Sequence, residues 1–290
     1  MPIKKSELIL NPDGSVYHLN LRPEHISKDI IFVGDQNRVE KITSHFDNIL
    51  FETQKREFKT HTGTYNGKRL TVISTGIGPD NIDIVMNELD ALLNIDLKTR
   101  QPKAKLGSFN IIRVGTSGAV QRGIPIDSFL MSTFGLDLNG MLHSYRTESI
   151  EHPLIENAFI KHTHWSANKA KPLLCGNSYE LEQQFDGNHI YKGVTATAGG
   201  FYGPQGRILR LPLADEELNN KINSFKFQDL RITNFEMETA AIYGMAKLLG
   251  HNALSLNAII ANRADGTFSK NPEQTIERLI EYTLKKIVIL

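Results

Sequence analysis

The sequence predicts one α/β domain, because strand-like and helix-like segments alternate along it without a break. Apolar runs of strand length occur at 29–34, 69–75, 109–115 and 253–261, and helical spacing of apolar residues appears at 79–95. No proline- or serine-rich linker divides the chain, which argues against two separate domains. With 290 residues, of which 40% are hydrophobic and 22% charged, the chain can bury a substantial core.

The first half of the chain reads as an arm, four strands and a helix. Residues 1–28 are polar and contain proline, so we expect an arm that precedes the domain at 29–290. Asn66-Gly67 is a typical two-residue hairpin turn between two of the predicted strands. The predicted strands are 29–34, about 48–54, about 57–66 and 69–75, and the helix at 79–95 places on one face Ile82, Val85, Met86, Leu89 and Leu92.

The second half begins after a basic connector at 96–107, whose lysines and arginine favour a solvated surface loop. Gly250 is a suitable residue to end a helix that starts near 235. The predicted strands of this half are 109–115, 127–134, about 171–176, 190–198 and 253–261, and the predicted helices are 153–162, 215–223, 235–249 and 272–288.

Three glycine-bearing segments follow strand-like runs and predict an anion site. They are 34–38, 75–79 and 113–118, and we read each as a turn after its strand. Glycine lets backbone N–H groups converge on an anion, and such turns gather at the carboxyl ends of strands in an open α/β sheet. The chain therefore looks built to hold a small phosphate-like anion.

Two arginines near these turns supply matching charge. Arg113 interrupts an apolar strand, so it needs an anionic partner, which could be a ligand or a structural carboxylate. Arg38 lies at the start of a predicted helix, where positive charge opposes the helix dipole; that placement suits an anion site better than it suits stability.

Two further segments carry candidate polar contacts. Glu236 and Glu238 could accept hydrogen bonds from sugar hydroxyls, although Thr233–Glu236 also fits a capping box that would explain Glu236 structurally. The loop at 198–207 combines Phe201, Gln205 and Arg207, a set able to stack on and hydrogen-bond a polar heterocycle.

Composition excludes several classes of function. A formal net charge of +1 gives no reason to expect nucleic acid as a partner. The single cysteine, Cys175, allows no intramolecular disulfide and fits a reducing compartment. No run approaches the ~18 apolar residues of a membrane span, and no signal peptide is visible, so we expect a cytoplasmic protein without a membrane partner.

Taken in order, the motifs resemble those of the nucleoside phosphorylase superfamily, of the hexameric and uridine type, and the uridine phosphorylases most closely. The resemblance implies a three-layer αβα domain whose mixed central sheet is partly barrel-like. The segments that carry it are Tyr17-His18-Leu19, 34–39, Arg56-Glu57-Phe58, 74–78, 113–118, 201–207, 234–239 and Asn262-Arg263.

The resemblance also implies roles for single residues. Phosphate would be bound by Gly34, Arg38, Arg113 and Thr116, with Arg56 from a neighbouring subunit. Ribose would be held by Met237 and Glu238, with His18 of the neighbour at the 5′-hydroxyl. The base would be recognised by Phe201, Gln205 and Arg207, with Glu236 and Arg263 lining the pocket less directly. Gln205, Arg207, Glu238 and Arg113 would carry the catalysis.

The implied reaction is phosphorolysis of uridine, or another pyrimidine nucleoside, to uracil and ribose 1-phosphate. No cofactor is required, since phosphate is a second substrate. A homodimer would be the smallest complete unit, and assembly into a hexamer is left open. Some relatives bind a monovalent cation at the dimer interface through a residue matching Glu57; Asn81 differs from their serine, so the metal stays undecided.

Three alternatives remain open from the sequence. A purine nucleoside phosphorylase would need an acid near Arg263, and Asp265 lies two residues away. A hydrolytic nucleosidase of the same fold would not need the three arginines at the phosphate positions. A nucleoside-binding protein without turnover would bind ligand but release no phosphate-dependent product.

Overall fold

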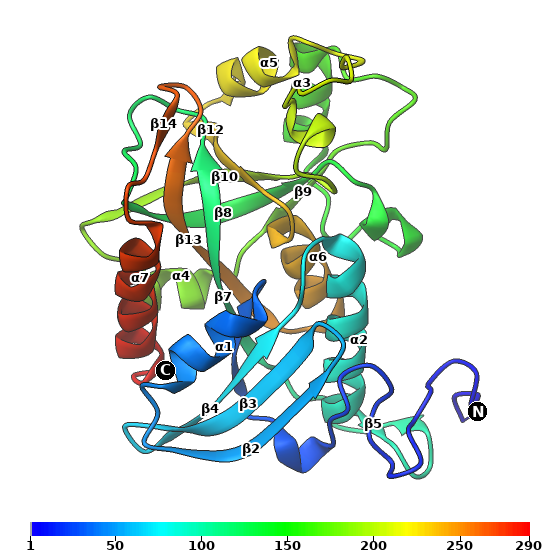
Figure 1. The fold of residues 1–290 in the computed structure, drawn as a ribbon. Helices are drawn as coiled ribbons and strands as arrows, with labels where there is room; N and C mark the ends of the chain where they lie inside the picture. The colour runs from blue at the N-terminus through cyan, green and yellow to red at the C-terminus, as the bar shows by residue number, and fades with distance from the viewer. Residues whose placement is uncertain (1) are drawn as a thin grey trace.

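A twelve-stranded mixed sheet runs through the molecule (Figure 1), in a computed structural model that describes residues 2–290. Its strands are β1 Asp29–Val33, β2 Asn48–Lys55, β3 Phe58–Tyr65, β4 Lys68–Ser74, β7 Asn110–Ala119, β8 Phe129–Asp137, β9 Leu173–Gly176, β10 Ile190–Thr197, β11 Lys226–Phe227, β12 Leu230–Glu236, β13 Asn252–Asn262 and β14 Thr267–Phe268. The main order is β11-β12-β10-β8-β13-β7-β1-β4-β3-β2.

Part of this sheet closes on itself. Strand β12 pairs with β10 on one side and, through Asn234 and Phe235, with the end of β7 on the other. Strands β7, β13, β8, β10 and β12 thus form a ring, while β1, β4, β3 and β2 continue as an open sheet. The partly barrel-like sheet is confirmed.

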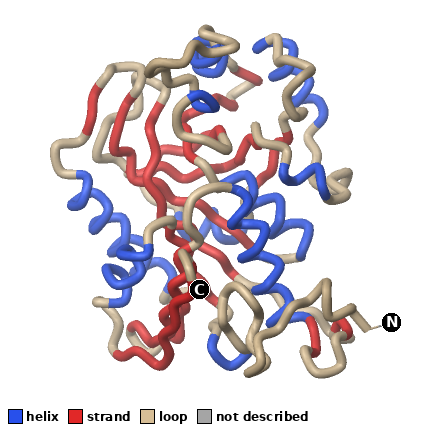
Figure 2. Tube along the Cα trace, turned by 45° about the vertical axis from the view of Figure 1, so that its right-hand side comes forward, coloured by secondary structure: helices blue, strands red, loops and turns tan. Residues whose placement is uncertain are grey.

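Helices cover both faces of the sheet (Figures 1 and 2), which confirms the three layers. On one face α1 (Gln36–Thr43), α4 (Tyr179–Phe185) and α7 (Pro272–Ile287) enclose one apolar cluster with the strands. On the other, α2 (Pro79–Asn94) packs against α6 (Thr239–Leu249) over a second cluster. The short helices α3 (Pro153–Thr163) and α5 (Leu218–Ser224) cover the barrel end. These apolar clusters hold the strand ends in fixed positions.

Most predicted elements are present within a few residues of their predicted ends, including the Asn66-Gly67 hairpin and the buried face of α2. Two predictions are wrong. Residues 233–236 are the end of strand β12, so they form no capping box, and α6 begins at Thr239 instead of 235. Gly115–Gly118 form no turn, because β7 continues to Ala119 and pairs there with β13 and β12. Strand β12 and helix α4 were not predicted.

The N-terminal segment packs on its own chain. Val16, Leu19 and Leu21 are fully buried in the cluster beneath α2. The carboxylate of Glu88, on α2, accepts hydrogen bonds from the backbone N–H groups of His18 and Leu19. Residues 2–28 are therefore anchored to the domain rather than free of it.

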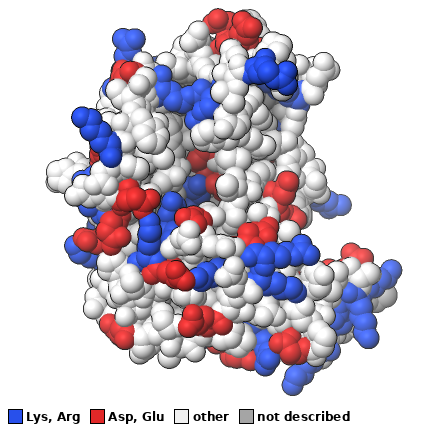
Figure 3. Space-filling model, in the orientation of Figure 1, with Lys and Arg blue, Asp and Glu red and all other residues white. Residues whose placement is uncertain are grey.

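The basic connector is mainly a surface segment, as predicted, and contains the small hairpin β5 (Ile95–Asp96) and β6 (Gln101–Pro102). Arg100 in its turn donates to the carbonyl oxygens of Ile3, Lys4 and Leu8, so it ties down the N-terminal segment. Figure 3 shows Lys and Arg side chains gathered where these two segments lie, while acidic and basic groups are interspersed over the rest of this face. Among the described residues, no helix has the length and apolar character needed to cross a bilayer.

Candidate active site

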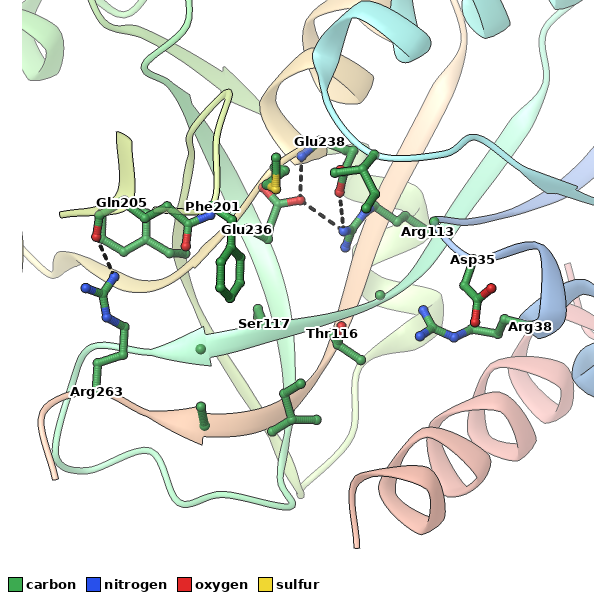
Figure 4. Close-up of a pocket in the computed structure, with 18 of the residues that line it drawn as sticks. Asp35, Arg38, Arg113, Thr116, Ser117, Phe201, Gln205, Glu236, Glu238 and Arg263 are labelled. Carbon is green, nitrogen blue, oxygen red and sulfur yellow. Dashed lines mark hydrogen bonds and ion pairs between the residues drawn. The ribbon is translucent and has the colours of Figure 1, made fainter. Parts of the chain in front are cut away.

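A pocket of about 970 Å³ opens where β1 and β4 end and β7 enters the barrel. It gathers most of the residues predicted for the site: Gly34, Arg38, Arg113, Thr116, Phe201, Gln205, Arg207, Glu236, Met237, Glu238 and Arg263. They come from distant parts of the chain, and Figure 4 shows the labelled ones converging on one cavity.

Arg113 lies at the centre of a buried charge cluster. Its guanidinium donates to Glu238 Oε2 at 2.6 Å and to Asn257 Oδ1 at 3.1 Å, and lies 3.2 Å from Glu236 Oε2. Burial alone would lower the pKa of Arg113, but the two carboxylates outweigh it and raise the pKa. The structural ion pair considered from the sequence is therefore present.

Glu236 organises this cluster and the start of α6. Its Oε2 accepts hydrogen bonds from the backbone N–H groups of Glu238 and Thr239, and its Oε1 accepts from Thr197 Oγ1 at 2.6 Å. A carboxylate before a helix satisfies N–H groups that have no partner within the helix and favours the helix dipole. Although Glu236 lines the pocket, its oxygens are occupied by protein groups.

Glu238 lies between Arg113 and the start of α2. Its Oε1 accepts a hydrogen bond of 2.8 Å from the N–H of Gly78, which caps α2 with a φ of +99°. Burial raises the pKa of Glu238, and the Arg113 charge opposes that rise. The carboxylate is thus held in place from two sides while it faces the pocket.

Arg38 extends the positive end of the pocket. It lies in the first turn of α1, as expected, and donates to the carbonyl of Val114 at 3.3 Å. Burial and the nearby charge of Arg113 lower the pKa of Arg38. Among residues 2–290, no carboxylate lies within ion-pair distance of Arg38. Arg38 and Arg113 are thus neighbouring cations, and Arg38 has no carboxylate partner in the described chain. This arrangement favours binding of an anion beside Gly34 and Thr116.

A second cationic group lies at the opposite end of the pocket, where Figure 4 shows Gln205 and Arg263. Arg207 donates to Gln205 Oε1 at 2.5 Å and stacks 3.8 Å from the centre of the Phe201 ring. Arg263 donates to the backbone carbonyl of Gln205 at 2.7 Å. Burial lowers the pKa of Arg207, and burial with the Arg207 charge lowers that of Arg263 to about 10. Guanidinium groups stay protonated in proteins, and neither arginine has an ion-pair partner in the described chain.

Gln205 completes this end as a recognition group. Its side chain is almost fully buried, with its oxygen taken by Arg207 and its amide nitrogen making no hydrogen bond to the described residues. A ring with carbonyl oxygens could accept hydrogen bonds from this nitrogen and from the arginines, and could stack near Phe201.

Two predicted residues, His18 and Arg56, lie outside this pocket. His18 contacts Glu88 through Nδ1 at 2.7 Å, on the α2 side of the molecule. Arg56 is exposed in the β2–β3 turn with a φ of +56°, and its carbonyl accepts from Gln36 Nε2 at 2.7 Å. Its neighbour Glu57 does line the pocket. In residues 2–290, no three His, Cys, Asp or Glu side chains gather as a metal site.

Asp265, the acid of the purine alternative, does not line the pocket. Its side chain is 40% exposed and lies 3.9 Å from Arg122. Arg263 occupies the pocket wall in its place.

Several pocket and support residues were not singled out from the sequence. Ser117 lines the wall between the two cationic ends. Asn257 accepts a hydrogen bond from Arg113 on the side away from the pocket. The signal for Asn257 is its alternation with Ser255 in an otherwise apolar strand, which puts two polar side chains on one face. Polar alternation within a buried strand could have indicated a supporting network.

Comparison with known proteins agrees with this geometry. Residues 28–288 match the family described as the phosphorylase superfamily. Uridine phosphorylase of Thermococcus kodakarensis is 31% identical over 268 residues, which cover 90% of this chain and 83% of that protein. Uridine phosphorylase of Haemophilus influenzae is 29% identical over 278 residues, 95% of this chain and 96% of that protein.

The fold has a solved counterpart as well. The crystal structure of a Trypanosoma brucei nucleoside phosphorylase that shows uridine phosphorylase activity aligns with a TM-score of 0.89 at 26% identity, covering 98% of this chain and all of that one. This chain belongs to the phosphorylase superfamily, and its fold is the nucleoside phosphorylase fold.

Proposed function

We propose that this protein catalyses the phosphorolysis of uridine to uracil and ribose 1-phosphate. The observation that carries the proposal is one pocket that has at each end an arginine without an ion-pair partner in the described chain, with the Glu238 carboxylate between the two ends. One end suits inorganic phosphate and the other suits a base that becomes an anion as it leaves. The relatives named uridine phosphorylase support uridine as the nucleoside.

Each substrate group has complementary protein groups. Phosphate would lie between Arg38 and Arg113, near Gly34 and Thr116. The ribose would contact Met237 and Glu238, whose carboxylate can accept from sugar hydroxyls. The base would lie near Phe201, with Gln205 and Arg207 contacting its polar edge and Arg263 behind them.

The chemistry follows from these contacts. As the bond from C1′ to the base nitrogen breaks, its electron pair moves onto the pyrimidine, and Arg207 with Gln205 stabilises that charge. Positive charge grows on the ribosyl carbon, and the phosphate dianion stabilises it and then forms the new C1′–O bond. Holding both reactants in line supplies much of the rate, ~7–11 kcal/mol in favourable systems. Phosphate is the nucleophile, so we expect no redox cofactor.

The complete site, in this proposal, is shared between two copies of the chain. His18 and Arg56 lie outside the pocket of their own chain, which leaves them available to a partner. We expect a homodimer as the smallest active unit, with a hexamer as a further assembly. Glu57 would be the contact for an interface cation, which a comparison of activity in potassium and in an organic-cation buffer would test.

The purine alternative has less support. Purine nucleoside phosphorylases are among the relatives, at 27% identity for that of Alkaliphilus metalliredigens. Asp265 lies off the pocket, however, and the guanidinium of Arg263 is a far weaker acid than the carboxylic acid that the purine reaction would use.

The deciding experiment follows uridine and inosine absorbance side by side, with and without inorganic phosphate. We expect phosphate-dependent cleavage of uridine and little cleavage of inosine. Cleavage of inosine alone would favour the purine reaction, and cleavage without phosphate would favour a hydrolase. Binding of uridine without product would favour a non-catalytic protein.

A further inference from the structure

Asn257 is a fully buried amide directly behind Arg113. It lies on β13, which pairs with β7 so that Asn257 is opposite Gly115 and Ser255 is opposite Arg113. Its Oδ1 accepts the 3.1 Å hydrogen bond from an Arg113 terminal nitrogen. Asn257 does not line the pocket, so it reaches the site only through Arg113.

The orientation of this amide is fixed by its neighbours. A guanidinium has only donors, so the amide oxygen must face Arg113. The amide nitrogen then faces the hydroxyls of Ser132 and Ser255, at 3.3 and 3.4 Å. Ser132 in turn is hydrogen-bonded to Thr195, and Thr195 to Asn234, inside the barrel. Asn257 therefore connects Arg113 to a rigid polar network.

The Arg113 guanidinium is confined on its remaining sides. It lies directly over Gly115, where an added Cβ would be 1.9 Å from a terminal nitrogen. Glu236 and Glu238 hold its other terminal nitrogen. Without Asn257, both carboxylates would draw the guanidinium toward themselves with nothing opposing them, and away from the anion position near Arg38.

We propose that Asn257 is a positioning residue that holds Arg113 where it can contact both Glu238 and the phosphate substrate. This inference rests on the proposed function, because it takes Arg113 as a phosphate ligand. It predicts that Asn257 governs the affinity for phosphate while leaving that for uridine almost unchanged.

The test compares Asn257→Ala, the nearly isosteric Asn257→Asp and the control Asn94→Ala. The control removes a buried amide of the same kind at the end of α2, where it hydrogen-bonds Asp90 and the carbonyl of Gly107, outside both the pocket and the Asn257 network. We expect KM for phosphate to rise about tenfold or more in Asn257→Ala, as for loss of a hydrogen bond to a charged group. In Asn257→Asp, a new negative charge beside Arg113 should raise KM for phosphate at least as much. KM for uridine should change by less than about threefold in both Asn257 variants, and Asn94→Ala should leave KM for phosphate near the wild-type value.

A purely structural role would lower the unfolding temperature of the Asn257 variants without this selective loss. A folded Asn257→Ala or Asn257→Asp protein with wild-type KM for phosphate would overturn the inference; if the alanine variant does not fold, the aspartate variant decides. Failure of the wild-type protein to cleave uridine with phosphate would instead refute the proposed function.

Discussion

At the scale of single residues, Arg113 shows why a buried cation in a strand is ambiguous from sequence. Either an ion pair or a ligand could explain it, and the two do not compete, because a guanidinium has five N–H donors. Glu238 and Asn257 take two of them, and Arg113 still lines the pocket. The ion pair offsets the cost of burial and keeps the residue available to an anion.

Arg207 is the residue whose loss should most directly affect departure of the base. We expect Arg207→Ala to lower kcat for uridine about 10²-fold, the usual effect of removing one group that stabilises developing negative charge. KM for phosphate should stay within about twofold, because Arg207 lies at the other end of the pocket. Steady-state kinetics with each substrate varied in turn would measure both quantities.

The matched control for this variant is Arg210→Ala, which removes an exposed arginine of the same loop that does not line the pocket. Equal losses in the two variants would indicate a general effect of loop charge. A rise in phosphate KM in Arg207→Ala would contradict the assignment of the two ends.

At the scale of elements, the start of α2 contributes to the site through its backbone. Gly78 has a φ of +99°, a conformation that residues with a side chain rarely adopt, and its N–H donates a hydrogen bond to Glu238. We expect Gly78→Ala to rotate this N–H away and to lower kcat/KM for uridine about tenfold, as for a lost hydrogen bond to a charged group. Kinetics and thermal unfolding should be measured on the same samples.

Gly67→Ala provides the comparison. Gly67 also has a positive φ, 75°, and open space around its Cα, but it lies in the remote β3–β4 hairpin. Both variants should lose stability, and only Gly78→Ala should lose activity beyond that. If the two lose activity equally, backbone strain explains the effect and the contact with Glu238 does not matter.

The carboxylate of Asp127 connects helix α7 to the barrel. This carboxylate accepts hydrogen bonds from Ser269 Oγ at 2.5 Å and Thr275 Oγ1 at 2.7 Å, and both bonds lower the pKa of Asp127 below its ordinary value of 3.8. A carboxyl with a lowered pKa in the folded state stabilises the fold above its unfolded pKa and loses that effect as pH falls through the folded pKa.

Wild type should therefore be more stable than Asp127→Asn at pH ~7, with the difference shrinking toward pH ~3. Asparagine tolerates the φ of +62° found at this position, so the substitution changes the charge without adding backbone strain. Urea unfolding midpoints at the two pH values would measure the effect. A difference that stays constant or grows on acidification would refute the role given to the carboxylate.

The sequence predicted elements that have a clear hydrophobic period or a local turn motif. It did not predict elements whose structure depends on pairing with strands distant in sequence. The apolar face of α2 and the Asn66-Gly67 turn are local signals, and both are confirmed. Strand β12 contains Thr233, Asn234 and Glu236, which resemble a helix start locally but pair with β10 and β7 in the barrel. The same closure extends β7 through the glycines that look like a turn.

For the candidate site, the motifs indicated residues that line the pocket but not the protein groups that these residues contact. All eleven expected residues that line the pocket could be named from motifs, whereas Asn257 and Gly78 act through contacts that depend on the closed sheet. The carboxylate partner of Arg113 could not be predicted either. It follows the end of β12, where the sequence had predicted the start of a helix.

At the scale of the whole molecule, the pocket depends on the complete fold. Its wall runs from Gly34 to Phe268 in sequence, and ring closure through β12 brings Glu238 to Arg113. The phosphate end combines three distant segments of the chain, and the base end joins the loop at 201–207 to the end of β13. The near-neutral net charge of +1 gives little long-range attraction for phosphate, so selectivity has to come from the pocket itself.

The proposed sharing of the site between two subunits leads to a complementation experiment. His18→Ala and Glu238→Ala homodimers should each be strongly impaired, because every site lacks one group. In a mixed dimer, one of the two sites combines Glu238 of one chain with His18 of the other. Random exchange of equal amounts should therefore restore about a quarter of the wild-type sites. Activity after exchange, with exchange verified by mass-labelled subunits, measures this. Mixed dimers that form without regaining activity would mean that His18 serves no partner.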